Sequence, residues 1–326
     1  MLKFFKTNQV FLSAILIFYI ILLRFSVLLA PFKWNPSGQG ILSEWVYGWA
    51  GSQQLISHIL ATLVLLVQGF IINVLVINHR LSNEVNLYPG LFFVLLSCFI
   101  PDFLYLSPVL LGNLFFLFAL VELFDTYKNP ACADRIFNAG LWTGIASLFY
   151  MPFLFFFIVI MSGLNILRAF SLRERLMALI GLLLPYSFAG LYFFWFNRLD
   201  EFWQKQFVAN FDFLSFGGAP FGWETLIKVG FFAVLIFLAV FNNNLYLIKK
   251  NIQVQKKINI LYWIILSALL AAPFQQNLTL EHFLMITPPL GIFLAFTFST
   301  MKPQWAEAIH FLMVVAALTL QFTWWF

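Results

Sequence analysis

The chain has 326 residues, of which 62% are hydrophobic and 20% aromatic, while charged residues make up only 10%. Its 18 Lys and Arg residues against 13 Asp and Glu residues give a formal net charge of +5. Such a composition leaves too little polar surface for a protein in water, so the sequence excludes a soluble globular domain and predicts an integral membrane protein. The basic residues are scattered without interleaved aromatic residues, which argues against a nucleic-acid partner and in favour of membrane lipid.

Apolar segments of membrane-spanning length follow one another along the whole chain. A helix crosses the bilayer core with about 20 apolar residues, or fewer where neighbouring helices shield it. The long segment 136–167 is divided at Tyr150-Met151-Pro152, because proline removes a donor and restricts the residue before it, so we expect two half-length helices there. The expected segments are 10–30, 55–77, 88–100, 108–124, 136–167, 176–196, 225–247, 258–272, 283–300 and 305–323.

These segments predict an all-α, polytopic fold with about 11 transmembrane segments, some of them half-length. We expect residues 1–326 to form a single transmembrane domain, because no soluble domain or low-complexity linker interrupts the pattern. The first segment follows Lys3 and Lys6 but contains Arg24, and no small-residue cleavage site precedes Pro31. We therefore interpret it as a retained anchor instead of a signal peptide.

The distribution of Lys and Arg predicts the orientation, because cytoplasmic loops of bacterial membrane proteins hold the positive charge. With a cytoplasmic N-terminus, the opposite side receives only Lys33, Arg198, Lys205 and Lys228, and Arg24 lies near the outer end of the first helix. The predicted location is the bacterial inner membrane, in a multi-pass arrangement. The remaining basic residues are then cytoplasmic: Lys3, Lys6, Arg80, Lys128, Arg135, Arg168, Arg173, Arg175, Lys249, Lys250, Lys256, Lys257 and Lys302.

Two outward loops, 31–54 and 197–222, are much longer than the other connections. Loops longer than about 12 to 15 residues in a compact domain are usually functional or disordered, and these two are too aromatic to be disordered. In the second loop, Trp203, Phe207 and Phe211 recur at intervals of four residues. This spacing predicts a short helix that lies in the membrane interface.

Outward carboxylates are the candidates for acid–base or metal chemistry on a lipid-attached substrate: Glu44, Asp102, Asp200, Glu201, Asp212, Glu224 and Glu281. Most such groups are solvated interface charges. Glu44 is flanked by apolar and aromatic residues, and Asp102 follows Pro101 where the third segment breaks. Both are therefore expected to face a cavity, which at membrane depth is a hypothesis of function.

Histidines and amides supply further candidates. His58 lies one turn inside the second segment, where a histidine can also serve in a helix-to-helix hydrogen bond. His282 follows Glu281 and lies near Gln275 in the most polar run of the C-terminal half. The four histidines share no ligand spacing, so the sequence contains no metal-binding motif.

The middle of the chain carries a family resemblance over roughly residues 55–196. The residues that carry it are Tyr88-Pro89, Pro101-Asp102, Ser107-Pro108, Phe137-Asn138-Ala139-Gly140-Leu141, Leu148-Phe149-Tyr150-Met151-Pro152, Arg173-Glu174-Arg175 and the stretch 181–185. With this succession the region resembles the membrane core of C-type glycosyltransferases, the polytopic enzymes that move sugars from polyprenyl-phosphate carriers outside the membrane. The whole phenylalanine-rich chain also resembles an uncharacterised family of bacterial inner-membrane proteins.

The resemblance implies that the chain handles a polyprenyl-phosphate-linked sugar or glycolipid at the periplasmic face. C-type glycosyltransferases carry an acid in the first outward loop, where Glu44 is the only acid here. Under this hypothesis Glu44 is the general base, and Asp102 is a second acid that binds a divalent metal or orients the acceptor. Arg198 and Lys205 would contact the phosphate, because an anionic carrier requires cations at that face.

His58, His282 and Gln275 complete the expected substrate site. The sequence identifies no cofactor beyond the divalent metal that Asp102 could bind. A non-catalytic membrane subunit of an envelope assembly or secretion complex is the alternative, in which aromatic surfaces dock a membrane-protein partner. A transporter is less favoured, because the ionisable residues at membrane depth are essentially Arg24, His58 and His310.

Overall fold

The computed structural model describes residues 10–29, 39–50, 54–210, 222–248, 250–275 and 279–323, and the elements in these ranges are helical without strands. The α-helices are α1 (Val10–Leu23), α2 (Phe25–Leu29), α3 (Ile41–Ala50), α4 (Gln54–Asn78), α5 (Tyr88–Ser97), α6 (Pro108–Phe124), α7 (Ala133–Phe149), α8 (Phe157–Leu167), α9 (Leu172–Trp195), α10 (Leu199–Trp203), α11 (Trp223–Phe241), α12 (Asn243–Leu247), α13 (Ile252–Ala271), α14 (Thr287–Thr300) and α15 (Pro303–Thr323). Short 3₁₀ segments are η2 (Pro101–Phe103), η3 (Met151–Phe156), η5 (Ala272–Phe274) and η6 (Leu280–Ile286), and η4 (Gln204–Val208) is a π-helical turn.

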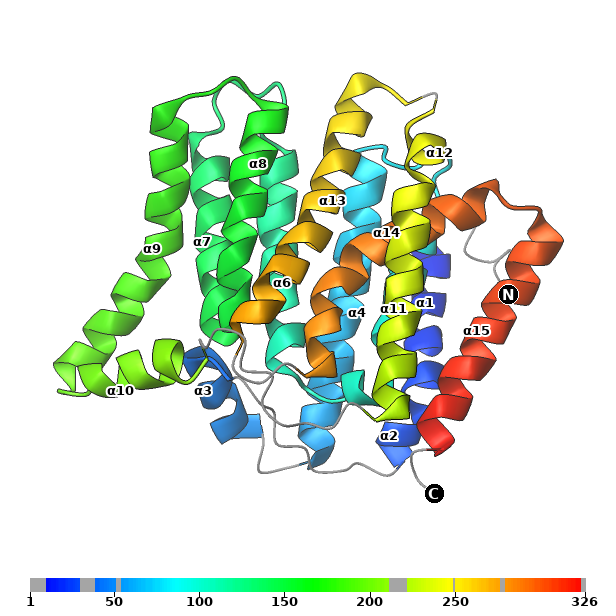
Figure 1. Cartoon of the computed structure of the whole chain (residues 1–326), viewed down its shortest axis with the longest axis horizontal. Helices are drawn as coiled ribbons and strands as arrows, with labels where there is room; N and C mark the ends of the chain where they lie inside the picture. Colours follow the sequence, from blue (N-terminus) through cyan, green and yellow to red (C-terminus); the bar gives the residue numbers. More distant parts are fainter. Residues whose placement is uncertain are drawn as a thin grey trace.

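The long helices stand side by side in one bundle with two distinct ends (Figure 1). At the lower end of the view, α3 and α10 lie across the ends of the upright helices, and we name this the α3–α10 end. The opposite end holds the α4–α5, α6–α7, α8–α9 and α12–α13 connections, and we name it the basic end. Ten expected cytoplasmic basic residues fall in described ranges, and most of them lie in or beside those four connections.

The helices match the segments expected from hydropathy, so the all-α, polytopic membrane fold is confirmed. Within the described ranges, five helical stretches are long and apolar enough to cross a membrane, namely 54–78, 172–195, 252–274, 280–300 and 303–321. Shorter apolar helices cover 88–97, 108–124, 151–167 and 225–241. The expected break at Tyr150-Met151-Pro152 separates α7 from η3 and α8.

Close helix contacts in the bundle depend on glycine. Gly140 of α7 faces the carbonyl of Ala178 on α9, and Gly181 of α9 faces the carbonyl of Phe137 on α7. A Cβ at these two glycines would lie 2.1 and 2.2 Å from the respective oxygens. Small residues let helix backbones approach in a membrane, where packing replaces the hydrophobic effect between helices.

Buried amides also join the helices. Gln68 of α4 donates to the Leu110 carbonyl at 2.6 Å, and Asn73 accepts from the Gly90 N–H at 2.8 Å. The Tyr19 hydroxyl lies 3.1 Å from His310 Nε2, which gives that histidine a partner on α1. Polar side chains at membrane depth therefore connect helices here.

A continuous series of polar contacts joins the helices at the basic end. Lys257 Nζ lies 2.7 Å from His79 Nδ1, and His79 Nε2 lies 3.6 Å from Asp125. Arg135 then contacts Asp125 at 3.2 Å and Glu122 at 2.9 Å. Burial, together with the neighbouring Lys257 charge, lowers the pKa of His79 to about 4, so this imidazole is neutral at pH 7.

The described parts of the two expected outward loops contain helices. Helix α3 occupies residues 41–50 of the first, with Trp45 and Trp49 exposed and Ser43 buried. In the second, the expected surface helix is present as α10 and continues into η4. Phe211, which completes the four-residue spacing, lies outside the described residues.

Candidate functional site

The break after α7 creates the attachment point for α3. Helix α7 ends at Phe149, and its last carbonyls lack partners in the helix because η3 begins at once with Met151 and Pro152. The Phe149 carbonyl accepts from the Gly40 N–H at 3.0 Å and from the Ser43 hydroxyl at 2.7 Å. A Cβ at Gly40 would lie 2.1 Å from the Leu148 oxygen, so only glycine allows this approach.

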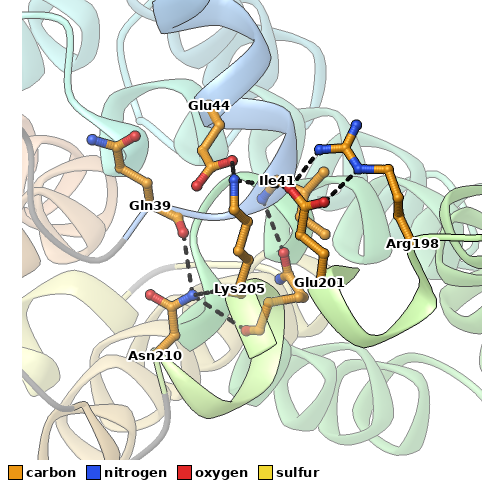
Figure 2. A network of polar contacts seen from close by, with 8 residues as sticks. Gln39, Ile41, Glu44, Arg198, Glu201, Lys205 and Asn210 are labelled. Carbon is orange, nitrogen blue, oxygen red and sulfur yellow. Dashed lines mark hydrogen bonds and ion pairs between the residues drawn. The ribbon is translucent and has the colours of Figure 1, made fainter. Parts of the chain in front are cut away.

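Gln206 joins α3 to α7 from the π-helical turn η4. Its side chain is fully buried, its Oε1 accepts from the Ile41 N–H at 3.1 Å, and its Nε2 donates to the Ser147 carbonyl at 2.9 Å. Asn210 Nδ2 donates to the Gln39 carbonyl at 3.2 Å. Residues 39–50 and 199–210, which are far apart in sequence, therefore form one unit at the end of α7, and Figure 2 shows polar contacts between the two segments. A π-turn often marks a functional position in a helix.

This unit brings four charged side chains together (Figure 2). Lys205 Nζ lies 2.6 Å from Glu44 Oε2 and 3.3 Å from Glu201 Oε1. Arg198 donates to both oxygens of Glu201, at 2.5 and 2.8 Å. The hydrogen bond with Glu44 raises the pKa of Lys205, and the hydrogen bond from Arg198 lowers the pKa of Glu201. Two cations and two carboxylates thus compensate one another, and we name these four residues the interfacial charge network.

A second, buried group of polar side chains lies at the same end. The Tyr105 hydroxyl donates to Glu281 Oε1 at 2.8 Å. The Tyr150 hydroxyl lies 2.5 Å from Gln275 Oε1 and 3.2 Å from His282 Nδ1, and His282 Nε2 lies 2.8 Å from the Ala268 carbonyl. Because Nε2 faces a carbonyl, it carries the ring proton, which leaves Nδ1 as an acceptor. We name Tyr105, Tyr150, Gln275, Glu281 and His282 the buried polar cluster; each side chain is at most 5% exposed.

Helix α3 contacts the chain beside this cluster. The Tyr47 hydroxyl donates to the Leu106 carbonyl at 2.7 Å, one residue after Tyr105. Burial raises the pKa of Tyr47, and the charge of Glu281 raises it further. Burial, Glu281 and then Asp102 raise the pKa of Tyr105 far above its usual range. The charge of Glu281 therefore acts on both phenols, and Tyr105 donates a hydrogen bond to it.

Asp102 lies at the margin of the cluster and has its own partner. Its Oδ2 is 2.7 Å from Lys228 Nζ, and the two side chains are 16% and 15% exposed. Breaking such a poorly hydrated pair leaves a buried charge, which is costly. Among the described residues, no group of three or more His, Cys, Asp and Glu side chains is arranged to hold a metal ion.

Most of the candidate site residues predicted from the sequence thus fall into two groups, each joined by its own contacts. Glu44, Arg198 and Lys205 meet in the interfacial charge network, whereas Gln275 and His282 meet in the buried polar cluster. His58 is buried on α4, one turn from the α3–α10 end. The two proposed acids have different cationic partners, Lys205 for Glu44 and Lys228 for Asp102.

Sequence reasoning missed Gln206 and the two tyrosines, and it ranked Glu281 below other outward acids. Glu281 receives its hydrogen bond from Tyr105, which is 176 positions away, so no local sequence pattern predicts this contact. The available signal was its position beside His282 in the polar run 275–282. Buried polar groups require partners, and that run offers several in an otherwise apolar half of the chain.

No family model matches the sequence, and no curated protein matches it significantly. Solved structures do match. The fold resembles that of ArnT from Cupriavidus metallidurans. Its apo structure aligns with a TM-score of 0.57 at 14% identity, and its structure bound to undecaprenyl phosphate aligns with a TM-score of 0.51 at 13% identity.

Each alignment covers 92% of this chain but only 58% of ArnT, so this chain spans a little over half the length of the proteins it matches. At this identity the likeness concerns the fold alone. It confirms the all-α, polytopic helical fold, and the likeness to ArnT extends beyond residues 55–196 to most of the chain.

Proposed function

We propose that this chain handles a polyprenyl-phosphate-linked sugar at the α3–α10 end, which faces the periplasm with the N-terminus in the cytoplasm of a bacterial inner membrane. The proposal rests chiefly on one observation: in a fold shared with ArnT, two interfacial segments hold four paired charges at the end of the bundle that also holds a buried carboxylate. The excess of Lys and Arg at the basic end supports the orientation.

In this proposal the carrier phosphate competes with carboxylates for Lys205 and Arg198. Glu44 and Lys205 are 35% and 42% exposed, so an anionic head group can reach them from the interface. Binding of the phosphate to Lys205 releases the Glu44 carboxylate, which is then available as a base. The bonds lost and gained are both charge-assisted, and a phosphate that contacts Lys205 and Arg198 together would favour the exchange.

The proposed transfer step assigns a role to each of these residues. An acceptor hydroxyl oxygen forms a bond to the anomeric carbon of the sugar as the bond from that carbon to the phosphate oxygen breaks. The acceptor proton passes to Glu44, and the polyprenyl phosphate leaves with the electron pair. Asp102 orients the acceptor, while His58, Gln275 and His282, with Glu281, bind the sugar hydroxyls.

Binding of undecaprenyl phosphate to the purified protein tests the first step. We expect undecaprenyl phosphate, but not undecaprenol, to raise the thermal midpoint in detergent, and the Lys205→Met variant to lose this effect. Lys256→Met, at the basic end, is the matched control and should respond like the wild type. A response to undecaprenol equal to that for the phosphate would refute a phosphate site.

Cell-surface glycans test the chemistry. We expect Glu44→Gln to retain binding of undecaprenyl phosphate and to lose transfer, because the amide keeps the shape of the side chain but accepts no proton. Glu201→Gln removes a neighbouring carboxylate that has no proposed proton-transfer role and is the control. Unchanged glycans in the Glu44→Gln strain at normal protein level would remove Glu44 from the site.

One observation favours a non-catalytic subunit as the second candidate function. Large aromatic side chains are exposed near the α3–α10 end, among them Trp49 at 74% and Trp195 at 82%. Such surfaces suit a membrane-protein partner as well as lipid. A partner that co-purifies in mild detergent, together with full tolerance of Glu44→Gln and Asp102→Asn, would favour this function.

A further inference from the structure

A cavity of about 430 Å³ lies at the basic end, between the end of α4 and the start of α13. The side chains around it are mostly polar, and they include Arg80, Ser82, Asn83, Lys250, Asn251 and Gln253. A smaller cavity of about 110 Å³ adjoins it, because Ser82, Asn83 and Lys250 line both. Neither cavity shares a residue with the candidate functional site, which lies at the opposite end of the bundle.

Two cations, Arg80 and Lys250, make this cavity positively charged. Lys250 is held by its hydrogen bond to the Leu81 carbonyl at 2.8 Å, and it is partly buried. In the part of the chain that the structure describes, neither Arg80 nor Lys250 forms an ion pair with a carboxylate. Glu84 contributes only to the adjoining smaller cavity. The larger cavity therefore carries uncompensated positive charge.

The backbone around the cavity adds donors. Helix α13 begins here, and its N-cap residue Asn251 provides no side-chain cap for the first-turn N–H groups. The first N–H groups of a helix, together with its dipole, favour an anion. The amides and hydroxyl of Asn83, Gln253 and Ser82 can bind the polar atoms that accompany such an anion.

Arg80 occupies a backbone position that glycine prefers. Its φ is 51°, and the Arg80 and Leu81 N–H groups donate to the carbonyls of Ile77 and Val76, which is the usual glycine-containing end of a helix. An arginine is less stable than glycine in this conformation. The Arg80 side chain is exposed and lines the cavity, so its guanidinium is available to a ligand.

We propose that this cavity binds a phosphate group that carries a polar, hydroxylated head, through Arg80, Lys250 and the first turn of α13. The volume exceeds that of a bare ion, and the polar amides around it suit hydroxyl groups next to the phosphate. The phosphate can belong to a phospholipid head group or to a small soluble molecule. Basic pockets between helices at the cytoplasmic side of membrane proteins commonly take anionic lipid heads.

Native mass spectrometry with two probes tests the proposal and distinguishes the sources. The purified protein in detergent is titrated with phosphatidylglycerol and, separately, with glycerol 1-phosphate. We expect Arg80→Gly to weaken binding of whichever probe binds the wild type by roughly tenfold, since one charge-assisted hydrogen-bonding partner is lost. Retention of phosphatidylglycerol alone supports a lipid head group, whereas binding of glycerol 1-phosphate supports a soluble ligand.

The chain provides a matched control for Arg80→Gly. Lys128 also has a positive φ, 56°, and lies at the basic end outside the cavity. Both glycine variants should raise the thermal midpoint, because glycine suits these conformations, but only Arg80→Gly should lose binding. Equal binding by the wild type and both variants, or binding of neither probe to the wild type, would overturn the proposal.

Discussion

Replacing Gln206 by alanine tests the architecture that supports the interfacial charge network. The side chain is fully buried and binds two backbone groups, accepting from the Ile41 N–H and donating to the Ser147 carbonyl. Alanine leaves both backbone groups without these partners, at about 1–3 kcal/mol for each. Because water can approach from the nearby interface, we expect a loss of about 2–4 kcal/mol in the docking of α3.

Hydrogen–deuterium exchange measures this docking directly. A loss of about 2 kcal/mol corresponds to roughly 30-fold faster exchange of amides over residues 41–50, if these open locally. Gln204 lies in the same π-turn with an exposed side chain, so Gln204→Ala is the matched control. Similar exchange over 41–50 in both variants would show that Gln206 does not attach α3 to α7.

Three further predictions concern stability, measured as unfolding of the purified protein in detergent. Burial lowers the pKa of His79 to about 4, below its unfolded value of about 6.5. The free energy of unfolding should therefore fall as the pH decreases from 6.5, by about 2 kcal/mol at pH 5, and His79→Gln should abolish this pH dependence. Lys228→Met should cost about 3 kcal/mol by leaving Asp102 unpaired, and a second change, Asp102→Asn, should restore most of it. Gly140→Ala should cost about 1–3 kcal/mol, since its Cβ would overlap a carbonyl of α9, whereas Gly190→Ala, with open space around it, should cost nothing.

Hydropathy and proline predicted the membrane fold because both act locally. The break between α7 and α8 follows from Tyr150-Met151-Pro152, and α6 begins at Ser107-Pro108, where the Ser107 hydroxyl caps the Leu110 N–H. A cap or a proline needs no distant partner to have its effect. For this reason the helix boundaries could be approached from the sequence alone.

The helix α3 and the role of Glu281 could not be predicted in the same way. Residues 41–50 look like an aromatic loop in sequence, and the helix is fixed at its start by Gln206, 165 positions away. Glu281 likewise depends on Tyr105. Contacts of this kind arise only after the bundle has assembled, so a single sequence shows the residues but not their partners.

The uneven distribution of broken helices provides a final argument for function at the α3–α10 end. In the described residues the 3₁₀ segments η2, η3, η5 and η6 all lie at this end, and Pro101, Pro152 and Pro273 stand within three of them. Each break frees backbone groups, which is tolerated at membrane depth only where protein or a cavity satisfies them.

Side chains of the candidate site satisfy several of these freed groups. Ser43 binds the Phe149 carbonyl, Tyr47 binds the Leu106 carbonyl, and His282 binds the Ala268 carbonyl. An uninterrupted helix would satisfy its own carbonyls without polar partners from distant segments. Four such breaks at one end therefore cost helix stability, but they hold polar side chains in fixed positions. Local strain together with fixed polar groups is expected of a binding or catalytic site.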